Sequence, residues 1–135
     1  MNRADAHDFV TTNHHAVMVT RRSDGGFHTT PVLAGVDDEG LVISSREATF
    51  KTHNLRRDPR VTLCVMNDRF YGDWIQVDGA ATIVSLPEAM DGLIDYYRRI
   101  SGEHPDWDDY RRAMKEERRV LIRVTIEAAG PSRTG

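Results

Sequence analysis

Short apolar runs separated by polar turns dominate the first third of the chain. Alternation of apolar and polar residues over five to ten positions is typical of β-strands, and the connecting segments 21–26 and 37–40 are rich in Asp and Gly, as hairpin turns are. An opening helix is expected over residues 4–12. Three strands joined as a meander are expected over residues 16–20, 27–36 and 41–43.

The period of the pattern changes after residue 43. Ser44 followed by Glu47 matches a capping box, in which two side chains satisfy the free N–H groups that begin a helix. Pro59 cannot continue a helix, and the residue before a proline is disfavoured in helical geometry. The pattern therefore predicts a helix that begins at Ser44 and ends before Asp58, with an inward stripe of Ala48, Thr52 and Leu55.

The second half of the chain mixes strands and helices. An apolar strand is expected over 61–66, and a longer one over 74–84 carries Gly79 at its centre, which is typical of a bulge or bend in a barrel. Pro87 begins a predicted helix that ends at Ser101-Gly102. A charged helix over 107–117 and a strand over 120–126 follow. Six strands with peripheral helices predict one domain, residues 1–135, of the α+β class: a small, mainly β antiparallel barrel.

Composition narrows the functional classes. Of the 135 residues, 39% are hydrophobic and 29% charged, as in ordinary soluble domains, and the net charge of -3 argues against a general nucleic-acid binder. No apolar stretch is long enough to span a membrane. The single cysteine, Cys64, cannot form an internal disulfide, so a cytoplasmic location is expected. Residues 130–135 are expected to form a loose tail.

Ser44, Ser45, Thr49 and Lys51 are candidates for an anion site. Hydroxyls and free N–H groups at the start of a helix bind anions, and a nearby lysine adds a positive charge. The alternative is a capped helix with a solvated lysine that binds nothing. Cations at and just beyond the end of the predicted helix either extend this basic surface or only favour the helix's negative end; these are Arg56, Arg57 and Arg60.

Two other groups are candidates for contact with a flat ligand. Pro31, within Thr30-Pro31-Val32, removes one donor from its strand, which leaves backbone groups free for a planar ring; alternatively it only protects a sheet edge. Trp74 and Gln76 share one strand face, and an indole beside an amide suits a heteroaromatic ligand. The alternative is a half-buried Trp with an exposed Gln. No histidine has a partner at metal-ligand spacing, so no metal site is expected.

Three stretches of the chain resemble the pyridoxamine 5'-phosphate oxidase-like, FMN-binding split β-barrel superfamily. They are Asp24-Gly25 with residues 29–32, residues 51–60, and residues 101–110 with 118–121. The last stretch is the most specific, and it resembles the actinobacterial branch that uses coenzyme F420. Together the likeness runs from Val17 to Ile126.

The resemblance implies a split antiparallel β-barrel that forms a homodimer with two cofactor sites at the interface. It implies that the cofactor phosphate lies near Ser44, Ser45, Thr49 and Lys51, and that its ring lies against residues 30–32. Trp74 and Gln76 would reach the ring from the partner subunit. Many relatives carry arginine where this chain has Thr49, so either Arg46 compensates for the lost phosphate contact or the cofactor binds more weakly.

The function that the resemblance implies is that of an F420-dependent oxidoreductase, which transfers a hydride from the reduced deazaflavin to a small unsaturated organic acceptor. The alternatives are an FMN-dependent oxidase or reductase on the same barrel and a non-catalytic F420 carrier. No side chain is assigned as catalytic, and the substrate is not specified, because a fold does not determine a substrate.

Overall fold

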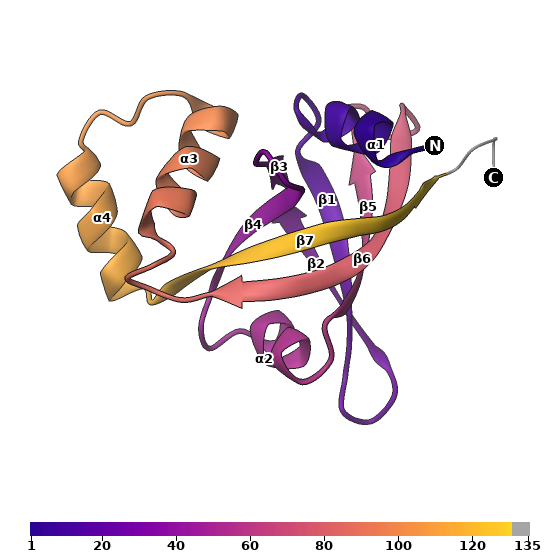
Figure 1. Cartoon of the computed structure of the whole chain (residues 1–135), viewed down its shortest axis with the longest axis horizontal. Helices are drawn as coiled ribbons and strands as arrows, with labels where there is room; N and C mark the ends of the chain where they lie inside the picture. Colours follow the sequence, from indigo (N-terminus) through magenta and orange to yellow (C-terminus); the bar gives the residue numbers. More distant parts are fainter. Residues whose placement is uncertain (131–135) are drawn as a thin grey trace.

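The computed structural model describes residues 1–130, and these form one curled antiparallel sheet with helices around it (Figure 1). Within these residues the sheet has seven strands in the order β2-β1-β5-β6-β7-β4-β3. The strands are β1 (His15–Arg21), β2 (Phe27–Leu33), β3 (Gly35–Val36), β4 (Leu41–Arg46), β5 (Arg60–Met66), β6 (Trp74–Val84) and β7 (Arg119–Gly130). The helices are α1 (Arg3–Val10), α2 (Phe50–Arg57), α3 (Met90–Ser101) and α4 (Trp107–Glu116).

The expected α+β class and antiparallel split barrel are confirmed, with one difference in the strand count. The strand expected over 27–36 is interrupted at Ala34, whose N–H makes the last backbone bond on the β1 side, to the carbonyl of His14 at 2.8 Å, before Gly35 and Val36 pair with β4. The chain thereby leaves one edge of the sheet, β2, and joins the other edge as β3. Because the sheet curls, β2 also contacts β4, and a barrel that is open on one side results. The expected tail begins within β7 at Gly130, and its remaining residues lie outside the described part.

The capping box predicted at Ser44 and Glu47 is wrong. The strand β4 continues through Arg46 because Ser44, Ser45 and Arg46 pair with the start of β7. The helix α2 begins later, at Phe50, and its N-cap is Thr49, whose hydroxyl accepts a hydrogen bond from the N–H of Thr52. A partner strand far along the chain therefore outweighed the local helix signal.

The ribbon of β6 and β7 is the longest in the sheet, and it bends as predicted. Its register shifts between Asp78 and Gly79. A Cβ atom at Gly79 would lie 2.2 Å from the carbonyl oxygen of Thr125, so only glycine allows this close approach of the two strands.

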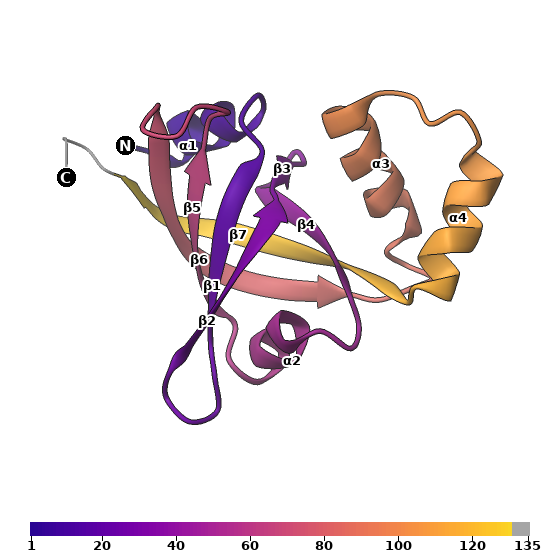
Figure 2. The ribbon, with the colours of Figure 1, turned by 180° about the vertical axis from the view of Figure 1, so that it is seen from behind.

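Helices cover different parts of the sheet: α1 and α2 lie at its two ends, and α3 and α4 lie beside it (Figure 2). Ala6 and Val10 of α1 belong to the main core inside the sheet. The helices α3 and α4 pack instead on the outer side of β4 and β7, in a second cluster with Val42 and Leu121. The helix α3 begins at Met90 and not at Pro87, because residues 87–89 first form a turn with a bond from the Met90 N–H to the carbonyl of Pro87.

Candidate functional site

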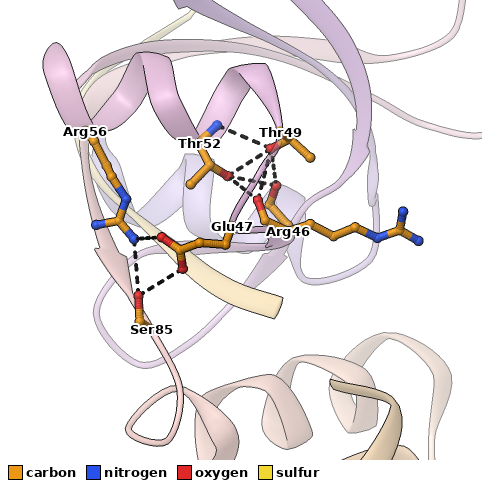
Figure 3. A network of polar contacts seen from close by, with 7 residues as sticks. Arg46, Glu47, Thr49, Thr52, Arg56 and Ser85 are labelled. Atoms are coloured by element: carbon orange, nitrogen blue, oxygen red, sulfur yellow. Dashed lines mark hydrogen bonds and ion pairs between the residues drawn. The ribbon is translucent and has the colours of Figure 1, made fainter. Parts of the chain in front are cut away.

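Hydroxyl groups organise the connection between β4 and α2 (Figure 3). Ser45 is 1% exposed, and its Oγ lies 3.0 Å from Oγ1 of Thr49 and 3.1 Å from Oγ1 of Thr52. The Thr52 hydroxyl donates to the carbonyl oxygen of Arg46 at 2.7 Å. The hydroxyls of Ser45 and Thr52 therefore position the turn, while Ser44 and Lys51, the residues that directly precede them, remain half-buried.

A second network fixes the same connection to β6. The guanidinium of Arg56 binds the carboxylate of Glu47 and the hydroxyl of Ser85, which in turn donates to the other Glu47 oxygen at 3.2 Å. In Figure 3 the side chain of Arg46 points away from this cluster. The positive charge of Arg56 is thus balanced within the fold.

The other two arginines of the predicted basic surface are also held by the protein. Arg57 donates to the backbone carbonyl of Arg21 and to the side chain of Asn54. Arg60 forms an ion pair with Asp58 at 2.6 Å, and this interaction lowers the pKa of the Asp58 carboxyl to about 2. These arginines therefore serve the end of α2 and the start of β5.

Lys51 differs from these arginines. Burial lowers the pKa of its ammonium group, and the charges of Arg119 and Arg46 lower it further. Arg46 and Arg119 stand opposite each other in the β4–β7 register and share the carboxylate of Glu117, at 3.2 and 2.9 Å. Within residues 1–130, Lys51 forms no ion pair. The first turn of α2 thus carries more positive than negative charge.

The segment Thr30-Pro31-Val32 lies on β2, an edge strand, as the proline suggested. Pro31 is exposed on the outer face, and Thr30 and Val32 point inward. This edge is near the first turn of α2, because the ring of His28 on β2 lies 5.9 Å from that of Phe50. The open edge and Lys51 therefore lie on neighbouring elements.

Trp74 and Gln76 lie elsewhere on the same chain. Both are exposed on one face of β6, where they line a shallow hollow of about 270 Å³ with Asp78 and residues 128–130. Across the sheet, Gln76 is in one row with Cys64, Val17 and Pro31. Three strand spacings separate Gln76 from Pro31, roughly 14 Å. Within one protomer, Trp74 and Gln76 therefore do not lie beside the β2 edge that is next to Lys51.

Arg119, the neighbour of Lys51, lies between the helix predicted over 107–117 and the strand predicted over 120–126 and was not a predicted site residue. The structure places it at the start of β7, with a buried Nε that has no hydrogen-bond partner in the described chain. The signals in the sequence were its position directly before an apolar run and its place in the stretch 118–121 that resembles the family. Pairing with β4 requires knowledge of contacts between distant segments, which a pattern of local periodicity does not contain.

The histidines of the N-terminal region support the fold. Nε2 of His7 lies 2.6 Å from the carbonyl oxygen of Asp37, and Nδ1 of His14 lies 2.9 Å from that of Ala34. Over residues 1–130, no group of three or more His, Cys, Asp or Glu side chains is arranged to hold a metal ion. In the same range no helix has the length and apolar character needed to cross a membrane.

Comparison with known proteins identifies the family. The family model described as pyridoxamine 5'-phosphate oxidase matches residues 3–131, nearly the entire chain. The chain therefore belongs to the pyridoxamine 5'-phosphate oxidase family.

Solved structures share this fold at low identity. A conserved hypothetical protein from Mycobacterium tuberculosis is 24% identical, with a TM-score of 0.78 over 100% of this chain and 92% of that one. A protein described as an F420 reductase is 20% identical, with a TM-score of 0.69 over 92% of this chain and 94% of that one. A proposed pyridoxamine 5'-phosphate oxidase from Listeria innocua is 15% identical, with a TM-score of 0.70 over 98% of both chains.

Proposed function

We propose that this protein is an oxidoreductase that binds coenzyme F420 and transfers a hydride from the reduced deazaflavin to a small unsaturated organic acceptor. The observation that carries the proposal is the half-buried Lys51, crowded by Arg46 and Arg119 next to the open edge of β2. A desolvated cation among like charges is stabilised when an anion binds, and the phosphate of the cofactor is such an anion. The family membership and the F420 reductase among the similar structures support the choice of cofactor.

Different residues would bind different parts of the cofactor. Lys51 would hold the phosphate, with Arg46 supplying the charge that an arginine at the position of Thr49 gives in relatives. The backbone of residues 30–32 would lie against the ring. The bound cofactor supplies the hydride, while the chain orients it, excludes water and leaves one ring face open to the acceptor.

A homodimer would complete the site, with Trp74 and Gln76 reaching the cofactor of the partner subunit. The outer face of the sheet supports this proposal, because Phe27, Leu33 and Trp74 are 54%, 45% and 43% exposed there. Half-buried Val17, Cys64 and Met66 lie between them on the intervening strands. Sedimentation analysis of the purified protein tests the assembly: a monomer at all concentrations would contradict it.

Side-by-side titration of the apoprotein with F420 and with FMN tests the cofactor. We expect tighter binding of F420. Preference for FMN would favour the alternative of an FMN-dependent oxidase or reductase, which the family membership also supports. Binding of neither would contradict the proposal.

A turnover assay separates an enzyme from a carrier. Reduced F420 bound to the protein is mixed with quinone and enone acceptors, and oxidation of the deazaflavin is followed by absorbance. We expect oxidation faster than in free solution. Tight binding without hydride transfer to any acceptor would instead favour the non-catalytic carrier.

A further inference from the structure

A second basic site lies where three separate segments of the chain meet. It is a pocket of about 310 Å³, which is near the lower end of the size of small-molecule sites. We call it the basic pocket, and its lining residues are Glu47, Ser85, Leu86, Lys115, Arg118 and Arg119. The N–H of Glu47 donates to the carbonyl oxygen of Arg118 at 2.9 Å, which joins the β4–α2 connection to the α4–β7 turn.

The charges of the basic pocket are only partly balanced by the protein, since Arg119 pairs with Glu117 at 2.9 Å but Lys115 and Arg118 are not paired within residues 1–130. Its only lining carboxylate, Glu47, is already bound by Arg56 and Ser85. Across the described chain, Lys115 and Arg118 form neither an ion pair nor a side-chain hydrogen bond. Three cations thus face one cavity in a protein whose net charge is -3.

The favourable interaction of a cation with the C-terminal end of a helix explains only one of these three residues. Lys115 stands in the last turn of α4, where a positive charge is favourable. Arg119, however, belongs to β7, and its Nε is buried without a partner, although buried polar groups are nearly always paired. Arg118 adopts a φ of 52°, in the left-handed region that Gly or Asn usually occupies. Stabilisation of α4 therefore explains neither Arg118 nor Arg119.

We propose that the basic pocket binds a small polyanion, a molecule with two or more carboxylate or phosphate groups, chiefly through Lys115 and Arg118, which the proposed cofactor site does not use. Three cations, on α4, on the turn after it and on β7, suit several negative groups on one compact ligand better than a single one. Leu86 adds an apolar wall that suits a short carbon skeleton. Such a ligand would be either the acceptor that is reduced or a metabolite that regulates the enzyme.

Calorimetric titration of the full-length protein with citrate and with pyrophosphate tests the basic pocket. We expect at least one of them to bind, and the double substitution Lys115→Gln, Arg118→Asn to weaken binding at least about tenfold, since charge-assisted contacts are lost. Asn is chosen because it tolerates the left-handed backbone. Arg111→Gln, one turn earlier on the exposed side of α4, is the control and should leave binding within about twofold.

The outcomes separate this proposal from the proposed function. Lys51→Ala should leave citrate or pyrophosphate binding intact, and the double variant should still bind F420. No binding of either probe, or an equal loss in the double variant and the Arg111 control, would overturn the proposal. Displacement of bound F420 by the probe would overturn the independence of the two sites. Faster or slower turnover with the probe bound identifies a regulator, and oxidation of reduced F420 to F420 with reduction of an unsaturated polycarboxylate such as fumarate identifies the acceptor.

Discussion

Charged side chains are paired at one end of the β4–β7 ribbon, whereas positive charge is in excess at the other end. At the start of β4, Arg123 meets Asp37 through two bonds of 3.1 and 2.8 Å, and the Asp37 side chain is only 14% exposed. At the other end, Arg46 and Arg119 share one carboxylate, and Lys51 has no counterion within residues 1–130. The first end is neutralised by the protein itself, whereas the second retains excess positive charge.

The difference separates charges that hold the fold from charges that are available to a ligand. Burial raises the pKa of Asp37, but hydrogen bonds from Glu39 and Gly40 and the contact with Arg123 outweigh it, so the pKa falls below 3.8. Burial and like charges lower the pKa of Lys51, which means that its charged form is less stable in the fold than in water. Asp37 therefore stabilises the folded state, and Lys51 destabilises it.

The largest effect is expected at the neutralised end. Asp37→Asn removes a charge that receives two backbone hydrogen bonds and the Arg123 pair, and we expect a loss of about 2–3 kcal/mol in the free energy of unfolding at pH 7. The stabilisation from a lowered carboxyl pKa is present above the unfolded value of 3.8 and is lost as the pH falls through the folded value. Urea unfolding at several pH values measures this, and a difference that persists undiminished at the lowest pH would contradict the assignment.

An intermediate loss of stability is expected when one of the neutral hydroxyls beside Lys51 is removed. Thr52 is fully buried, and Thr52→Val keeps its shape but removes one of the hydrogen bonds of Ser45 and one of those of the Arg46 carbonyl, so that both retain only Thr49. We expect a loss of about 1–2 kcal/mol, nearly independent of salt, because no charge is removed. Thermal unfolding at low and high ionic strength measures it. A strong salt dependence would mean that the hydroxyl network chiefly positions the neighbouring cations.

The smallest expected change in the free energy of unfolding is a gain, not a loss. Lys51→Met removes a desolvated charge, and we expect the cofactor-free protein to gain about 0.5 kcal/mol at pH 7. Because the lysine pKa is lowered, this gain should be full below the folded pKa and vanish above the unfolded value of 10.5. Urea unfolding at pH 7 and at alkaline pH measures the difference. A loss of stability at pH 7 would show that Lys51 supports the fold.

Local periodicity predicted most of the fold but not the connections between its parts. The bulge at Gly79 and the edge position of Pro31 followed from what glycine and proline allow in a sheet. The capping box failed because Ser44 and Ser45 pair with β7, a strand far along the chain. The helix start moved to Thr49, which satisfies the same chemistry five residues later.

Only part of the candidate site was predicted, because local periodicity does not show which distant segments pair. Lys51 stood out by its residue type and by the resemblance. Its neighbour Arg119 did not, because only the pairing of β4 with β7 places it there. Neither Arg118 nor Lys115 gives a local signal, since cations at the end of a charged helix are common. The excess of positive charge can be recognised only from the structure, which shows the ion-pair partners of each cation.

The most direct measurement is the dissociation constant of F420 for the wild type, Lys51→Ala and the control Arg111→Ala, each determined by fluorescence titration. Loss of a charge-assisted contact of about 1.5–3 kcal/mol predicts an affinity about 10- to 100-fold weaker for Lys51→Ala and unchanged for the control. High salt should reduce this difference. Equal affinity of Lys51→Ala and the wild type would contradict the assignment of the phosphate to the first turn of α2.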